Sequence, residues 1–161
     1  MSAPGDWRPL MDDAERLEAL EALVERLLDA SMAKLIIVEG KKDSRALASL
    51  GVAQNVVELN VGLSILSFCE KTALKHREVI VLTDWDRKGG RLFRQLADSF
   101  KSLGVAVDGR FRSDMAHLAK KGAKDVEGLP GFIRWLREAR DAGPKAALEH
   151  RRMALKRKER R

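Results

Sequence analysis

Four short apolar runs alternate with amphipathic segments along this chain, and this alternation limits the fold more than any other feature. The runs occupy residues 34–38, 56–59, 78–83 and 105–107. Segments with apolar residues at every third or fourth position separate them, and the connecting loops are short. This order is typical of a parallel sheet with helices on both faces. The sequence therefore predicts an α/β fold built on a four-stranded parallel sheet.

Helices are expected wherever apolar residues recur at helical spacing. The predicted ranges are 12–31, 43–50, 63–76, 88–103, 113–120 and 131–142. The first range permits two interpretations, a helix packed on its own domain or a helix that forms a dimer seam. Its pattern is too short for a sustained heptad repeat, which favours packing on its own domain.

Carboxylates follow two of the predicted strands directly. Glu39 comes after the first run, and Asp84 and Asp86 come after the third. Ligands bind outside the carboxyl ends of the strands in such sheets, and the three acids would gather there if the two strands are neighbours. Like charges held together favour a cation between them, and Mg²⁺ prefers oxygen ligands. The alternative interpretation is a polar turn, because Asp, Gly and Arg are common where strands end.

Basic residues flank these acids and are candidates for contact with phosphates. They are Lys41, Lys42, Arg87, Lys88 and Arg91. Each is also the kind of residue that commonly lies on a solvated surface.

The charge of the chain is unevenly distributed. The net charge is +7, and residues 145–161 hold eight Lys or Arg against two Glu, whereas residues 1–30 hold three Arg against eight acids. A basic body with a basic tail predicts a polyanionic partner bound with salt-dependent affinity. The tail residues expected to bind nucleic acid are Arg151, Arg152, Lys156, Arg157 and Lys158.

Several absences narrow the possibilities. No apolar run reaches the roughly 20 residues of a membrane span, and the N-terminus lacks the apolar region of a secretion signal. We therefore expect a cytoplasmic protein without a membrane partner. The single cysteine, Cys69, excludes an internal disulfide, and the absence of Tyr excludes a tyrosine nucleophile within this chain.

Two motifs together resemble the Toprim domain, the module shared by topoisomerases, bacterial-type primases, overcoming-lysogenization nucleases and 5S ribosomal RNA maturation nucleases. The motifs are IIVEGKKD at 36–43 and VIVLTDWDRKGG at 79–90, and the resemblance covers about residues 33–107. It implies a compact, Rossmann-like sheet. It also implies that Asp84 and Asp86 hold Mg²⁺ and that Glu39 is the general acid or base in phosphodiester chemistry. Arg87 and Lys88 stand where some members carry a further acid, so this chain departs from the family pattern beside the metal ligands.

The resemblance is strongest to the 5S ribosomal RNA maturation nuclease group. The missing Tyr excludes the topoisomerase nucleophile, and one cysteine excludes the thiolate zinc finger of primases. The segment at 124–128 is similar to a stretch of that maturation group. Within it, Glu127 is either an additional acid at the site or a residue at the entry of the next helix.

These observations predict an N-terminal amphipathic helix (1–31), a Toprim domain (32–110), a helical segment packed on it (111–142) and a basic tail (143–161). The predicted function is a nuclease that depends on Mg²⁺, with Mn²⁺ as a second candidate ion. It would cleave structured RNA rather than DNA, with a ribosomal RNA precursor and the ribosomal particle as candidate partners. The alternative is a non-catalytic accessory protein that binds nucleic acid or the ribosome and holds Mg²⁺ structurally. The oligomeric state stays open.

Overall fold

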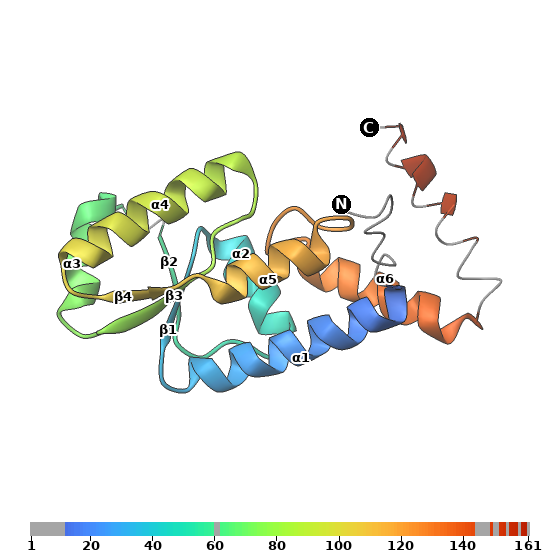
Figure 1. Ribbon diagram of the computed structural model, residues 1–161, viewed down its shortest axis with the longest axis horizontal. Coiled ribbons are helices and arrows are strands. Elements are labelled where there is room, and N and C mark those ends of the chain that lie inside the picture. Colours follow the sequence, from blue (N-terminus) through green and yellow to red (C-terminus); the bar gives the residue numbers. More distant parts are fainter. Residues whose placement is uncertain are drawn as a thin grey trace, which may run out of the picture.

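A four-stranded parallel sheet lies at the centre of the computed structural model (Figure 1), which describes residues 12–59, 62–143, 149, 152–153, 155–157 and 159–160. The strands are β1 (Leu35–Val38), β2 (Val56–Glu58), β3 (Glu78–Val81) and β4 (Ala106–Asp108). Their spatial order is β2-β1-β3-β4, and every neighbouring pair is parallel. The predicted sheet is confirmed, and β1 and β3 are its two central, adjacent strands.

Six helices surround the sheet within the described residues. They are α1 (Asp13–Ser31), α2 (Lys41–Ser49), α3 (Ile65–Ala73), α4 (Arg87–Ser102), α5 (Arg110–Ala119) and α6 (Leu129–Asp141). Side-chain caps set where several begin. The Asp12 carboxylate accepts the Glu15 N–H at 2.8 Å, and the Ser64 hydroxyl accepts the Ser67 N–H at 3.1 Å. The serine cap explains why α3 starts two residues later than the periodicity predicted.

Helices cover both faces of the sheet, as predicted. Successive strand residues point to opposite faces, so Leu35 and Ile37 pack toward α3 and α4, with Phe68 and Phe100. The alternate residues pack toward the other four helices in a second apolar cluster, and all of them are buried: Ile36, Val38, Ile80 and Leu82. Burial on both faces accounts for the unbroken apolar runs in the sequence.

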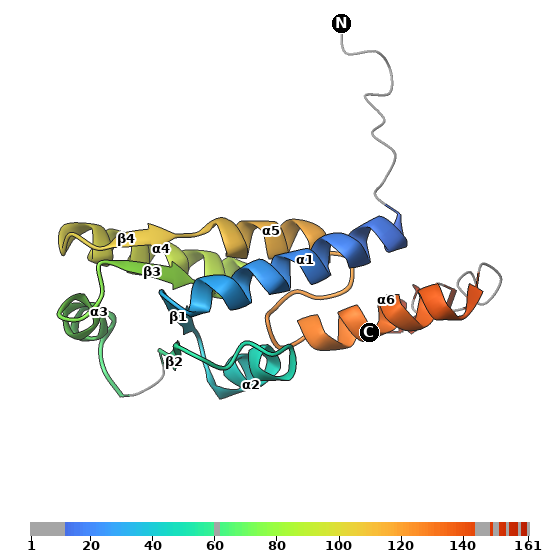
Figure 2. The same cartoon turned by 90° about the horizontal axis from the view of Figure 1, so that it is seen from below.

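The first helix packs against α5 and α6 and extends with them to one side of the sheet (Figure 2). Its apolar face is closed to solvent, since Leu17, Leu20, Leu23 and Leu27 are almost fully buried. This face therefore lies within its own chain, as the packing interpretation predicted. No helix among the described residues is both long enough and apolar enough to span a membrane.

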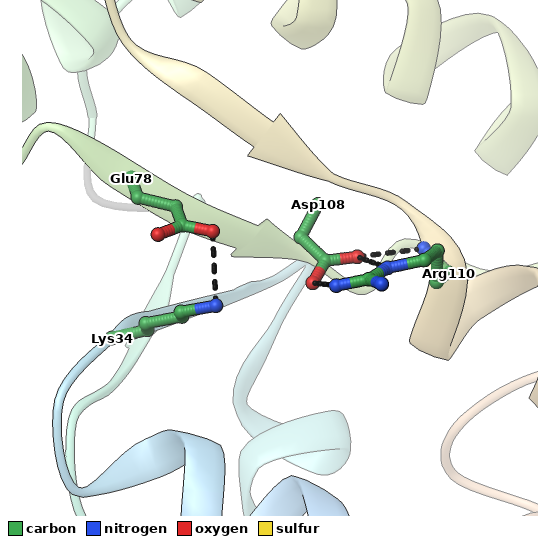
Figure 3. Close-up of polar contacts among 4 residues, drawn as sticks. All are labelled: Lys34, Glu78, Asp108 and Arg110. Atoms are coloured by element: carbon green, nitrogen blue, oxygen red, sulfur yellow. Dashed lines mark hydrogen bonds and ion pairs between the residues drawn. The ribbon is translucent and has the colours of Figure 1, made fainter.

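Two ion pairs lie along the β3 and β4 side of the sheet (Figure 3). Lys34 and Glu78 are 2.9 Å apart, and the Arg110 guanidinium lies 3.1 Å from Oδ2 of buried Asp108. Oδ1 of Asp108 also accepts the backbone N–H of Arg110 at 2.9 Å. These hydrogen bonds, with the positive charge of Arg110, lower the pKa of Asp108. They start α5 at residue 110, three residues earlier than the sequence predicted.

Replacing Asp108 by Asn should reduce the free energy of unfolding by about 1 kcal/mol at neutral pH, because the ionised partner of Arg110 is lost. A carboxyl whose pKa is lowered by folding stabilises above its unfolded pKa and loses this contribution as the pH falls through the folded value. Urea unfolding of the parent and of D108N at neutral and acidic pH measures this. The two curves should converge in acid; a constant gap would contradict the electrostatic explanation.

Candidate functional site

The adjacency of β1 and β3 brings Glu39 and Asp84 together at the carboxyl edge of the sheet. Oε2 of Glu39 accepts the backbone N–H of Asp84 at 2.9 Å. The two carboxyl groups also interact directly, and this interaction is one of the causes that raise the pKa of Asp84. A hydrogen bond between two carboxyl groups requires one of them to be protonated, which agrees with the raised pKa of Asp84.

Asp84 is partly buried, and its surroundings change its chemistry. Burial is the largest cause that raises its pKa, to about 8, and the Glu39 hydrogen bond and the nearby Asp43 and Glu39 charges add to it. The backbone N–H of Val126, 3.1 Å from Oδ1 of Asp84, acts in the opposite direction. Val126 belongs to the loop between α5 and α6, so that loop completes the surroundings of the acid.

Asp86 has a structural role that the polar-turn interpretation anticipated. Its Oδ1 accepts the Gly89 N–H at 2.6 Å and caps the N-terminus of α4. The strand ends at Val81, so Asp84 and Asp86 do not continue it, and strand geometry does not set their relative direction. Asp86 is exposed, and among the described residues its second oxygen, Oδ2, forms no hydrogen bond or ion pair.

The acid loop folds closely onto the first turn of α4. A Cβ atom on Gly89 would lie 1.8 Å from the carbonyl oxygen of Asp84. The buried Thr83 hydroxyl donates to the carbonyl oxygen of Gly89 at 2.9 Å. Only glycine permits this approach, so Gly89 holds the loop that carries Asp84 against the helix.

Arg112 is a residue at this site that the sequence did not single out. Its Nε donates to the carbonyl oxygen of Thr83 at 3.1 Å, and a terminal nitrogen donates to that of Asp84 at 2.8 Å. The guanidinium lies over the Phe93 ring, 5.2 Å from its centroid. Burial lowers the pKa of Arg112, and the charges of Asp86, Glu39 and Asp84 oppose this shift. The only signal in the sequence was its place in a basic segment.

Asp43 is a further acid near the pair. It is buried, and its Oδ2 accepts the Gly40 N–H at 3.1 Å. Burial is the largest cause that raises the pKa of Asp43, and the charges of Glu39, Asp125 and Glu127 raise it further. Asp43 belongs to the first sequence motif, but it was not singled out there as a residue of the site. Glu127 is exposed, with its Oε1 4.0 Å from Nζ of Lys42, so it lies at the rim.

The structure places the other predicted residues mostly on the surface. Among the basic residues beside the acids, all are exposed: Lys41, Lys42, Arg87, Lys88 and Arg91. In the tail, Arg152, Lys156 and Arg157 are exposed, whereas Arg151 and Lys158 lie outside the described residues. Trp85, between the aspartates, packs against the core, and its Nε1 donates to the Ala123 carbonyl at 2.9 Å.

The donor set at this edge suits a hard divalent cation. Mg²⁺ binds to proteins through one or two carboxylates together with waters and substrate phosphates, and Mn²⁺ takes similar oxygen ligands. Because the pKa of Asp84 is raised, a cation bound there would displace a proton from this carboxyl group. Within the part of the chain that the structure describes, no three acidic, His or Cys side chains already form a metal cluster. A site with few protein ligands fits both observations.

Metal-free protein should lose stability as the pH rises. The pKa of an aspartate is near 4 in an unfolded chain, whereas that of Asp84 is raised to about 8. Between these values the folded state binds the extra proton, so its stabilising effect is present in acid and lost toward pH 8. We expect a loss on the order of 2 kcal/mol between about pH 5 and about pH 8, measured by urea unfolding with chelator.

The control for this pH dependence is Asp84→Asn. Its side chain stays neutral throughout, so its stability should change much less over the same pH range. Equal slopes for the parent and D84N would show that another group carries the dependence.

Three comparisons relate the chain to known proteins. Residues 34–118 match the Toprim domain. A UPF0292 protein of Methanosarcina barkeri is 39% identical over 124 residues, which cover 76% of this chain and 86% of that protein. A UPF0292 protein of Pyrococcus furiosus is 36% identical over an alignment that covers 71% of this chain and 84% of that protein. A solved structure from Aquifex aeolicus gives a TM-score of 0.58 at 30% identity and covers 67% of this chain and 95% of that chain.

Proposed function

Because this chain belongs to the Toprim domain family and to the UPF0292 proteins, we propose that it is a Mg²⁺-dependent nuclease that cleaves phosphodiester bonds in structured RNA. A Toprim domain is a nucleic-acid-related, metal-binding fold. The observation that carries the proposal is the Glu39 and Asp84 pair at the carboxyl edge of the sheet, in which the Glu39 carboxylate accepts the Asp84 N–H and the pKa of Asp84 is raised. An aspartate whose pKa is raised so strongly beside a second acid is typical of a functional site.

Each acid has a role in this proposal. Asp84 and Asp86 hold the cation, and Glu39 moves a proton to or from the reacting oxygen as general acid or base. A bound Mg²⁺ or Mn²⁺ neutralises charge on the phosphate. Arg112 fixes the backbone of the acid loop through the carbonyl groups of Thr83 and Asp84.

The basic residues around the acids contact substrate phosphates in this proposal. They are exposed, and they lie next to the acids along the chain: Lys41, Lys42, Arg87, Lys88 and Arg91. Such contacts add affinity and hold the phosphodiester in register without reading its sequence. RNA rather than DNA is proposed from the resemblance to 5S ribosomal RNA maturation nucleases, with a ribosomal RNA precursor as a candidate substrate.

Cleavage assays test this function. End-labelled structured RNA, including a 5S ribosomal RNA precursor, and DNA of equal length are incubated with Mg²⁺, with Mn²⁺ or with chelator. We expect cuts in RNA that need a divalent ion and disappear with chelator. If no substrate is cut with either ion, the nuclease hypothesis is refuted, and the alternative, an accessory protein with a structural Mg²⁺ site, takes its place. The cap that Asp86 forms on α4 would suit such a structural role.

The basic tail should contribute phosphate affinity without specificity. Residues 145–161 hold eight Lys or Arg. Deleting them should make log Kd depend less steeply on log salt concentration, because several phosphate contacts are lost and each contributes a slope of about 0.9 on duplex. Fluorescence anisotropy with labelled RNA at increasing KCl measures the slope. Replacing the exposed Arg26 and Arg134 by Gln serves as the charge control, and an unchanged slope after deletion would contradict the role.

A further inference from the structure

Two surface depressions adjoin on the side of the sheet that carries α3. The larger, about 490 Å³, lies between the edge strand β2 and α3 and is lined by Val56, Phe68 and Lys75, among others. The smaller, about 310 Å³, contains Glu39 and Lys88. Leu63 and Phe68 line both depressions. They therefore form one groove, which we call the α3 groove, leading along α3 to the candidate catalytic glutamate.

The lining of the larger part of the α3 groove is mainly apolar. Val56 and Val57 of the edge strand, together with Leu63 and Phe68, form much of the lining of the larger depression. Leu63 is 43% exposed, although it is a large aliphatic side chain. An exposed apolar surface continuous with a candidate site indicates a binding surface more than chance exposure. A duplex cannot use such a lining, because its base faces are stacked inside the helix.

Cations stand along the rim of the groove. Lys71 and Lys75 of the α3 region line the larger depression, and Lys88 lines the smaller. Among the described residues, none of these lysines forms an ion pair, so their charge is available to a ligand. The acid of the larger depression, Glu58, instead accepts a hydrogen bond from the Ser44 hydroxyl at 2.6 Å.

We propose that the α3 groove binds an unpaired strand of the nucleic acid substrate and leads it to Glu39. Bases lie against the apolar lining, and phosphates meet Lys71, Lys75 and Lys88. A positively charged groove whose side chains also contact the bases is the usual arrangement for single strands, which offer both base faces and phosphates. In the α3 groove the bases would meet aliphatic side chains, since Phe68 is only 7% exposed. This inference rests on the proposed function for the identity of the substrate, and it adds that the strand must be unpaired beside the cut.

Binding measurements test the groove without requiring cleavage. The probes are a fluorescein-labelled unstructured RNA of about 20 nucleotides and a hairpin RNA of equal length, both in chelator. The double variant Lys71→Glu/Lys75→Glu should weaken single-strand binding at least about 10-fold. The control Arg26→Glu/Arg134→Glu changes the net charge equally at exposed positions on α1 and α6, across the sheet, and should weaken it less than about 3-fold.

A variant without charge change separates contact from general attraction. Leu63→Ser should lower single-strand affinity about 3- to 10-fold, because an apolar contact with the bases is lost, and should leave hairpin affinity unchanged. Leu63 is partly exposed, so the substitution spares the core. Thermal unfolding of each variant confirms that it is folded.

Three results would overturn the groove. The first is a groove variant that binds unpaired RNA no more weakly than its charge control does. The second is a parent protein that does not bind unpaired RNA. The third is an oligomer that dissociates in the groove variants while RNA affinity stays constant, which would make the surface an interface between copies. A parent that binds strands through the groove but cuts nothing refutes the nuclease alone. A parent that cuts, with groove variants that bind and cut equally well, refutes the groove alone.

Discussion

Replacing Glu39 by Gln should slow phosphodiester cleavage at least about 100-fold, because a general acid or base typically contributes a factor of 100 or more. Gln keeps an oxygen that can accept the Asp84 N–H, which Glu39 accepts at 2.9 Å, but its amide cannot take up a proton. The loss should therefore appear in the rate at saturating enzyme, with Kd for RNA little changed. Single-turnover cleavage of labelled RNA, together with anisotropy in chelator, measures both.

The matched control for this substitution is Glu25→Gln. Glu25 is an exposed residue of α1 that, within the described part of the chain, has no hydrogen bond or ion pair to the candidate acids, and the change removes the same charge. E25Q should cut at the parent rate. If E39Q also cuts at the parent rate, Glu39 is not the acid or base, and the proposed mechanism fails even if the protein remains a nuclease.

Replacing Gly89 by Ala should reduce cleavage by about 100-fold, because misplacing catalytic groups by about 1 Å is that costly. The new Cβ would lie 1.8 Å from the Asp84 carbonyl oxygen, so the acid loop must move away from α4. The same movement disturbs the hydrogen bonds of Arg112 to that loop. We also expect a loss of about 1 to 3 kcal/mol in the free energy of unfolding, as for other overpacked sites.

Gly90→Ala is the control beside it. A Cβ at Gly90 meets only the Arg112 side chain, at an ordinary 3.7 Å, so this helical position accepts alanine. G90A should be as stable as the parent or slightly more so, since alanine favours the helix. Urea unfolding and single-turnover cleavage of both variants make the comparison. Equal behaviour of G89A and G90A would show that the close approach is not needed.

The sheet could be predicted from sequence because its information is local. Each apolar run is short, and the runs of the two central strands are buried on both faces, as at 35–38 and 79–81. The prediction that Glu39 and Asp84 lie close together depended on a condition, because it required β1 and β3 to be neighbours. The order β2-β1-β3-β4 meets that condition.

The rest of the site depends on contacts between distant parts of the chain. Arg112 reaches the Asp84 carbonyl across 28 residues, and the Val126 N–H reaches its carboxylate across 42. Periodicity and spacing carry no information about such pairs. Asp86 is different, because an Asp directly before the first residue of a helix is a local capping signal, and α4 begins at Arg87. It supports the turn interpretation, which does not exclude a metal at its other oxygen.

The contacts of the loop between α5 and α6 have a consequence for how the site assembles during protein synthesis. It holds the acid loop twice, through the Trp85 bond to Ala123 and the Val126 bond to Asp84. The ribosome adds these residues after all three candidate acids. A nascent chain that has emerged only through β4 thus carries the acids but neither Arg112 nor Val126. Assembly of the candidate site is therefore delayed until nearly the whole domain has been synthesised, and an incomplete chain would not carry the finished site.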